Sequence, residues 1–235
     1  MKRRWLVGSV ALSVFAATSV AASARLGDHY QVRYNAADQR AARAVMLNPY
    51  RLAGLGAAPW MGGPQKVTRE DVTSTPCHHY TPKEADLVLT GAAKAAYVQR
   101  GENTIEKTVS RAGSLAFVFQ SADMLRRDWL RTPKPADLAS CLAASLRRSL
   151  PSNAKLVSFK QIPIPHPRVQ YAIAFEGVIH AWINSQGSRL RVLDTAYAIL
   201  GARPETRTEL GLFVILASPP LTAWAEGLLE GCFNV

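Results

Sequence analysis

Cys77, His78 and His79 form the cluster whose side chains are best suited to bind a metal ion. Thiolate and imidazole ligands suit zinc or copper, but a structural zinc site takes four ligands, and adjacent residues rarely converge on one ion. We therefore interpret Cys77 as a disulfide cysteine beside two exposed histidines, and we expect neither a metal site nor a cofactor. No motif connects this cluster with the remaining histidines, which are His29, His166 and His180.

Hydrolytic and nucleotide-dependent chemistry lacks its familiar motifs in this chain. The sequence contains no G-x-S-x-G nucleophile elbow, no H-E-x-x-H zinc motif, no G-x-x-x-x-G-K-[ST] phosphate loop and no dinucleotide-binding G-x-G-x-x-G. Two acidic pairs, Glu84 with Asp86 and Glu226 with Glu230, have the residue type that glycoside hydrolysis uses. The second pair falls at i, i+4 on a polar helix face, so we interpret it as solvated and assign no catalytic residue.

The first 24 residues have the pattern of a secretory signal peptide. Lys2, Arg3 and Arg4 precede an apolar run from Trp5 to about Val20, and the small residues 22–24 suit cleavage after Ala24. The run is shorter than the roughly 20 residues that span a bilayer, so we expect no transmembrane helix in the mature chain. The first cysteine is Cys77, so no lipoprotein signal is expected, and the pattern predicts a secreted bacterial protein.

The chain is basic, and the signal segment does not account for this. Without its three basic residues, 25 basic and 17 acidic residues remain, which gives the mature chain a charge of +8. A charge of this size favours anionic surfaces such as lipid headgroups or wall polymers. The basic residues are scattered apart from doublets at 126–127 and 147–148, and no RNA-binding or zinc-finger motif accompanies them, so we expect no nucleic-acid partner.

Three cysteines in an oxidising compartment predict one disulfide and one remaining thiol. Cys77 with Cys141 is the pairing that we favour. Cys141 with Cys232 is the alternative, because both lie on the predicted core-facing stripes of helices. Cys232 is accordingly either free or the alternative partner of Cys141.

Capping residues and hydrophobic periodicity outline a single domain over residues 36–235, after a spacer at 25–35. Helices are expected after Asn35, after Ser121, from Pro135 to about Leu150, and from Ser218 onward. Strands are expected at 87–89, 104–112, 114–120, 156–162, 169–175, 189–200 and 206–217, with Gly101 and Gly113 between strands and Ser114 as a hairpin residue. Residues 92–98 fit either a strand or a helical turn. The order predicts an α+β fold, in which helices pack on one face of an antiparallel four- to six-stranded sheet and the other face stays open.

The order of several short motifs resembles secreted and lipoprotein domains of actinobacteria. These motifs are Leu55-Gly56 before Trp60, then Cys77, Thr90-Gly91-Ala92, Cys141-Leu142 and a strand with Asp194. Such domains are similar to the extracellular sensor domain of mycobacterial receptor serine/threonine kinases, which implies an α+β fold whose concave groove takes a ligand. That sensor domain carries two disulfides, which three cysteines cannot form, and this chain shows no kinase portion or membrane tether. We therefore do not expect this chain alone to transduce a signal.

These observations favour an exported, non-enzymatic binding domain of sensor-like type. Its expected ligand is an unidentified small molecule, a peptide or a cell-envelope component. Two alternatives stay open: an extracellular hydrolase whose catalytic residues are dispersed through the sequence, and a cationic cell-surface adhesion protein that binds an anionic surface.

Overall fold

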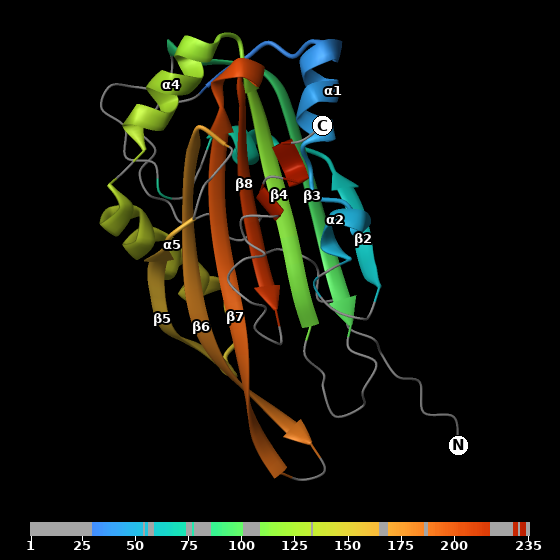
Figure 1. The fold of residues 1–235 in the computed structure, drawn as a ribbon. Helices are drawn as coiled ribbons and strands as arrows, with labels where there is room; N and C mark the ends of the chain where they lie inside the picture. The colour runs from blue at the N-terminus through green and yellow to red at the C-terminus, as the bar shows by residue number, and fades with distance from the viewer. Residues whose placement is uncertain are drawn as a thin grey trace.

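The fold is presented in Figure 1 as a computed structural model, which describes residues 30–53, 55, 59–73, 77, 86–100, 109–132, 134–164, 169–185, 188–216, 228–229 and 231–233. The expected signal segment lies outside these residues, so export stays a prediction. Of the expected C-terminal helix, only residues 228–229 and 231–233 are described.

Helices and strands alternate irregularly along the described part of the chain. The helices are α1 (Ala36–Ala44), α2 (Pro49–Leu52), α3 (Arg69–Thr73), α4 (Ala122–Arg131) and α5 (Pro135–Ser149), with the 3₁₀ turn η2 (Pro204–Thr206). The strands are β1 (Gln31–Val32), β2 (Trp60–Gln65), β3 (Val88–Arg100), β4 (Val109–Phe119), β5 (Ala154–Ile162), β6 (Tyr171–Ser185), β7 (Ser188–Arg203) and β8 (Thr208–Leu216).

The predicted helix starts at Asn35, Ser121 and Pro135 are confirmed. The Asn35 side chain accepts a hydrogen bond from the backbone N–H of Asp38, and Ser121 does the same for Met124. Pro135 occupies the first turn of α5, where its missing N–H leaves no intrahelical hydrogen bond unmade. These caps satisfy backbone donors that the first helical turn leaves without a partner.

The sheet is larger than the sequence predicts, and it is mixed. Its eight strands run in the order β1-β3-β4-β8-β7-β6-β5, with β2 also pairing with β3. The consecutive antiparallel pairs β5–β6, β6–β7 and β7–β8 form the predicted meander. The two-residue strand β1 pairs in parallel with β3, and β2, with sequence WMGGPQ, has no alternation of apolar and polar residues. Periodicity therefore gave no signal for either strand, and the prediction of four to six antiparallel strands is wrong.

Two local predictions are corrected along β3 and β4. Residues 92–98 belong to the strand β3, and they pair with β4 on one side. Gly113 and Ser114 lie in the middle of the continuous strand β4 and not in a hairpin. The Ser114 hydroxyl is buried and accepts a hydrogen bond from the backbone N–H of Leu47, which ties the segment after α1 to the sheet.

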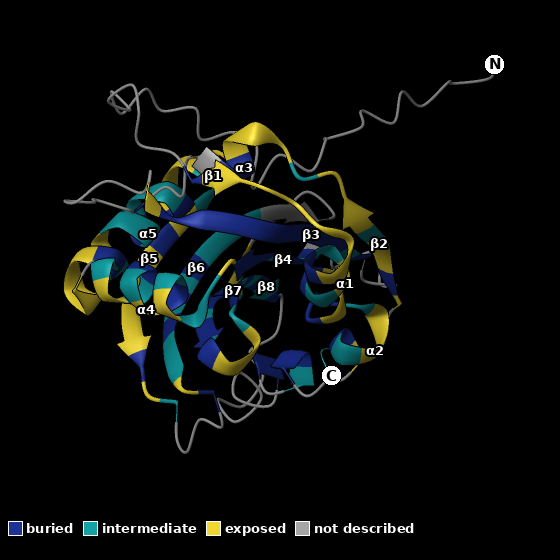
Figure 2. Ribbon diagram, turned by 90° about the horizontal axis from the view of Figure 1, so that it is seen from above, coloured by how far each residue is buried: buried dark blue, intermediate teal, exposed yellow. Residues whose placement is uncertain are grey.

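Both faces of the sheet are covered, which also corrects the expected open face. One face, here called the α1 face, packs against α1, α2 and residues 228–229 and 232–233, and the α5 face packs against α5 (Figure 2). On β7, Tyr197 and Ile199 are buried on the α1 face, and Ala196 and Ala198 are buried on the α5 face. Apolar residues at both odd and even positions of a strand are typical of a sheet that is buried on both sides.

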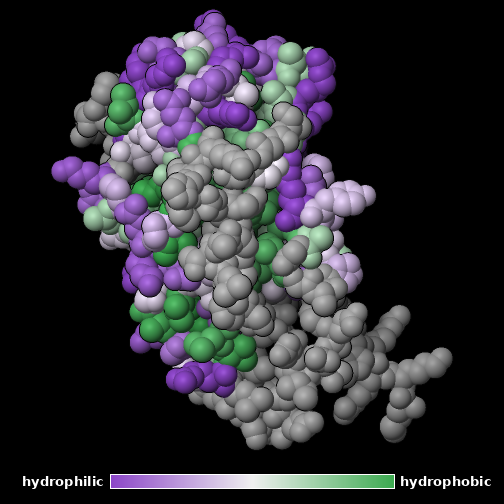
Figure 3. Space-filling view, viewed as in Figure 1, coloured by the Kyte–Doolittle hydropathy of each residue, from purple (hydrophilic) through white to green (hydrophobic). Residues whose placement is uncertain are grey.

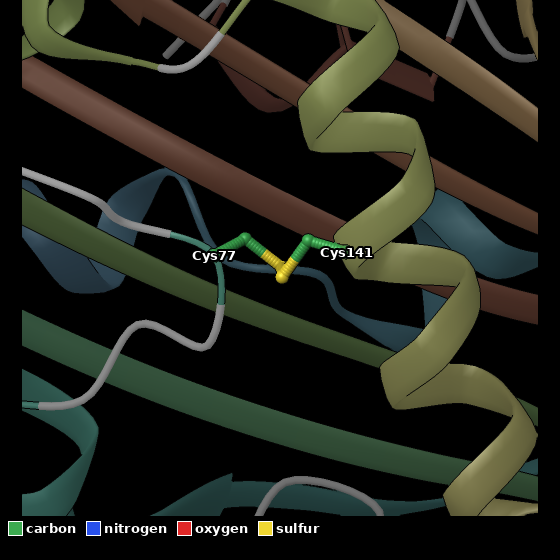
Figure 4. The surroundings of a disulfide bond; sticks show 2 residues. All are labelled: Cys77 and Cys141. Carbon is green, nitrogen blue, oxygen red and sulfur yellow. A yellow bond between two sulfur atoms is a disulfide. The ribbon is translucent and has the colours of Figure 1, made fainter. Parts of the chain in front are cut away.

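A disulfide joins Cys77 to Cys141, so the favoured pairing is confirmed (Figure 4). The bond connects the segment before β3 to α5 and closes a sequence separation of 64 residues. Cys77 packs in an apolar cluster with Leu138, Phe175 and Ala198. Cys232 is a buried free thiol in the core of the α1 face.

Reduction of the disulfide is expected to destabilise the fold by about 2–4 kcal/mol, because the open chain gains conformational entropy when unfolded. Urea denaturation with and without a phosphine reductant measures this difference. The double variant C77A/C141A is the matched control, since the reductant has no bond to break in it. A reductant effect of equal size in the double variant would contradict the assignment.

Cys232 is expected to resist thiol reagents in the folded protein. Burial raises the pKa of its thiol to about 11, so almost no thiolate forms at neutral pH. Titration with a chromogenic disulfide should detect no reactive thiol in the native protein and one reactive thiol per chain in denaturant. Peptide mapping should then find the label on Cys232, and label on Cys77 would refute the pairing.

Candidate functional site

The hairpin of β6 and β7 extends beyond the rest of the sheet. These strands pair along their whole length, from Tyr171 with Ala202 to Ser185 with Ser188. In the described part of the chain, β5 pairs with β6 only as far as Ala181, and β8 pairs with β7 only from Thr195 onward. Residues 182–185 and 188–191 therefore form a two-stranded ribbon that projects from the body of the molecule (Figure 1).

The register places five side chains of this region on one face. Lys155, His180 and Leu193 lie directly across from one another on β5, β6 and β7, and Trp182 pairs with Arg191 in the next row of the same face. Residues two positions apart along a strand point to the same side, so both rows belong to the α1 face. We call Lys155, His180, Trp182, Arg191 and Leu193 the ribbon surface.

The ribbon surface combines positive charge, aromatic rings and exposed apolar area. Lys155 and Arg191 are exposed, and Leu193 is 50% exposed. The His180 and Trp182 rings are half-buried and meet edge to face with centroids 6.5 Å apart. Hydrophobic side chains gather near the lower end of β5, with a hydrophilic group below them (Figure 3).

The hairpin carries no acidic residue between Glu176 and Asp194, while it contains Arg189 and Arg191. Glu176, on the α1 face, accepts a hydrogen bond of 3.2 Å from the Tyr197 hydroxyl, and the Lys160 ammonium lies 3.9 Å from it. Burial and the neighbouring Glu176 charge raise the pKa of Tyr197 to about 12, so this hydroxyl remains a donor. Among the described residues of β5, β6 and β7, the acid on the α1 face is thus engaged within the sheet.

Asp194 lies on the opposite face, away from the ribbon surface. It pairs with Ile179, which pairs in turn with Leu156, and both of these residues belong to the apolar cluster under α5. One carboxylate oxygen of Asp194 is buried and has no hydrogen-bond partner. Desolvation raises the pKa of Asp194 to about 6.

The other residues considered from the sequence do not converge on one site in the part that the structure describes. Asp86 is ion-paired with Arg127 and Arg131, and the hydrogen bond from Arg131 is the main reason that its pKa is lowered. No group of three or more His, Cys, Asp or Glu side chains in the described residues is placed to hold a metal ion. The candidates outside the described residues are His29, His78, His79, His166, Glu84, Glu226 and Glu230.

Two features of this region were missed in the sequence. Ser152 and Lys155 have the S-x-x-K spacing of serine β-lactamases and penicillin-binding proteins. They lie in a turn and the strand that follows it, and we assign them no catalytic role. The ribbon surface itself had a readable signal, namely a long alternating hairpin with arginines, a tryptophan and no acidic residue.

Searches of family models, curated proteins and solved structures found no match to this chain. The resemblance to kinase sensor domains therefore rests on the short motifs alone. No helix in the described residues has the length and apolar character needed to cross a membrane.

Replacing Asp194 with asparagine is expected to stabilise the protein in a pH-dependent way. The folded pKa of about 6 lies above the ordinary value of 3.8, so the native state binds the proton more tightly than the unfolded state does. Native stability then falls as the pH rises through 6, and the variant escapes this loss. After allowance for partial exposure, D194N should be more stable than wild type by about 1–2 kcal/mol at pH 7.5 and nearly equal at pH 4. Denaturant titrations at both pH values measure this, and an equal difference at both would contradict it.

Proposed function

We propose that this chain is an exported, non-enzymatic binding domain whose ligand is an anionic component of the cell envelope, and that the ribbon surface binds it. The observation that carries the proposal is the hairpin's composition: two arginines, one histidine and one tryptophan, without an acidic residue from 177 to 193. Lys155 of β5 adds a further exposed cation beside His180 and Leu193.

The electrostatics of the whole chain support an anionic ligand. The charge expected for the mature chain attracts anions over distances comparable with the Debye length, about 8 Å at physiological salt. The ribbon extends this charge away from the body, where exposed cations meet a planar or polymeric partner without obstruction from the helices. Salt-sensitive association is the expected signature.

The proposed binding site is the ribbon surface, and not the concave groove that the family resemblance implied. Side chains of α1, α2 and residues 228–229 and 232–233 pack on one face of the sheet, and α5 packs on the other, so the described core leaves neither face open. The projecting hairpin is the part of the sheet that these elements do not cover (Figure 1).

The hydrolase alternative gains no support from the described residues. His180 and Asp194, the histidine and the perturbed carboxyl of the hairpin, lie on opposite faces. A general acid–base pair needs its groups within hydrogen-bond reach of one reacting atom. A binding role is therefore the better proposal.

Neutralising the two exposed cations of the ribbon surface is expected to weaken binding to anionic partners. A basic residue near an anionic surface contributes about 1 kcal/mol, so K155Q/R191Q should raise Kd about 30-fold. The probes are phosphatidylglycerol vesicles and a soluble glycerol-phosphate polymer, each at low and high salt.

The matched control is R40Q/R43Q, which removes the same charge from exposed positions on α1, at the other end of the molecule (Figure 1). This control should change Kd only by the small effect of net charge. Equal losses in both double variants would mean that net charge, and not the ribbon surface, governs binding. Absence of binding to either probe at low salt would reject the proposed function.

A further inference from the structure

The exposed apolar side chains of the ribbon region distinguish between kinds of anionic partner. Leu193 is 50% exposed, and Val157, in the bulge of β5 between Leu156 and Ser158, is 52% exposed. Trp182 lies next to Leu193 across the hairpin, one row further out. A soluble polyanion offers phosphate to Lys155 and Arg191 but no apolar material to these three side chains.

We infer that the partner of the ribbon surface is a phospholipid bilayer with anionic headgroups, which Trp182 and Leu193 enter to the depth of the interface. This inference rests on the proposed function for its location and adds the identity of the partner. Tryptophan suits the boundary between headgroups and acyl chains, because its ring is apolar and its N–H remains polar. Leucine beside it contributes apolar area, and flanking cations meet the headgroup phosphates.

The shape of the hairpin fits such an approach. The strands extend about four residues past the end of β5, a length of about 13 Å at the usual rise per residue. Trp182 and Arg191 form the first row past the end of β5, and Leu193 lies level with Lys155. These side chains therefore meet a bilayer that lies along this face of the hairpin, and the depth of about 5–10 Å to which interfacial segments bury their apolar side is enough to cover them. The backbone of an open two-stranded ribbon stays near the hydrated headgroups, since its edges cannot be satisfied in the acyl core.

The charges around the hairpin agree with this orientation. Lys155 and Arg191 are exposed on the side that carries Trp182 and Leu193. Asp194 lies on the opposite side, among the apolar residues under α5, and burial favours its neutral form. Glu176 lies further from the tip and is engaged by Tyr197 and Lys160.

The experiment uses the full mature chain with three probes: vesicles of phosphatidylcholine, vesicles containing 30% phosphatidylglycerol, and a soluble glycerol-phosphate polymer. The variant L193N removes apolar area and leaves every charge in place. It should bind the anionic vesicles about fivefold more weakly than wild type, while its affinity for the polymer is unchanged. The matched control is L130N, because Leu130 is 80% exposed on α4, far from the ribbon.

A second measurement reports the position of the indole. Brominated lipids quench tryptophan fluorescence at the interface, and the quenching lost in W182F relative to wild type is that of Trp182. We expect this loss with anionic vesicles and none with the polymer. Quenching that W182F retains in full would overturn the inference.

Failures of the two proposals are distinguishable. Equal binding to polymer and vesicles, both insensitive to L193N, would overturn the bilayer assignment and leave the proposed function standing. No binding to any probe would reject both. A dimer in sedimentation equilibrium that L193N dissociates, without vesicle binding, would assign the apolar patch to a second copy of this chain instead.

Discussion

The antiparallel pairing of β6 with β7 is the constraint on which the rest of the structure depends. Its 15 residue pairs join the body of the sheet to the projecting ribbon without a break in register. A shift by one residue would move every side chain of one strand to the other face. Tyr197 and Ile199 fix the register because they are buried on the α1 face. The same register then places Leu193 and Arg191 on that face, so packing in the core decides which residues the ribbon surface presents.

Long-range polar contacts hold the body on which this hairpin is mounted. Arg207 adopts a left-handed backbone conformation with φ of 58°, which is uncommon for a residue with a side chain. Its guanidinium donates to the carbonyls of Phe119 and Gln120 and to the Asp38 carboxylate, and these bonds hold the β7–β8 connection against β4 and α1. A second such contact, between Lys94 and Asp71, is buried at 2.7 Å and secures α3 to β3. With the disulfide, these contacts tie segments that are distant in sequence.

The sequence predicted elements whose signals are local, and it missed features that depend on partners. The caps at Asn35 and Ser121 and the period-two strands of the meander are readable because each residue's own type determines them. Strand β2 pairs with β3 through its backbone, and its glycines and proline form no pattern that predicts a strand. The ribbon was missed for a related reason. Its existence depends on where β5 and β8 stop pairing, which the hairpin's own residues do not specify.

The arginines of the hairpin also have an explanation that involves no ligand. A free strand edge invites pairing with other chains, and charged side chains on it oppose such aggregation. That need is met by either sign of charge, and opposite charges across the hairpin would add about 0.2–1 kcal/mol of stability per pair. This hairpin instead omits acids from 177 to 193 and exposes Leu193, which protects no edge. Edge protection accounts for the presence of Arg191, and the anionic bilayer that we propose would also account for the exposed Leu193 beside it.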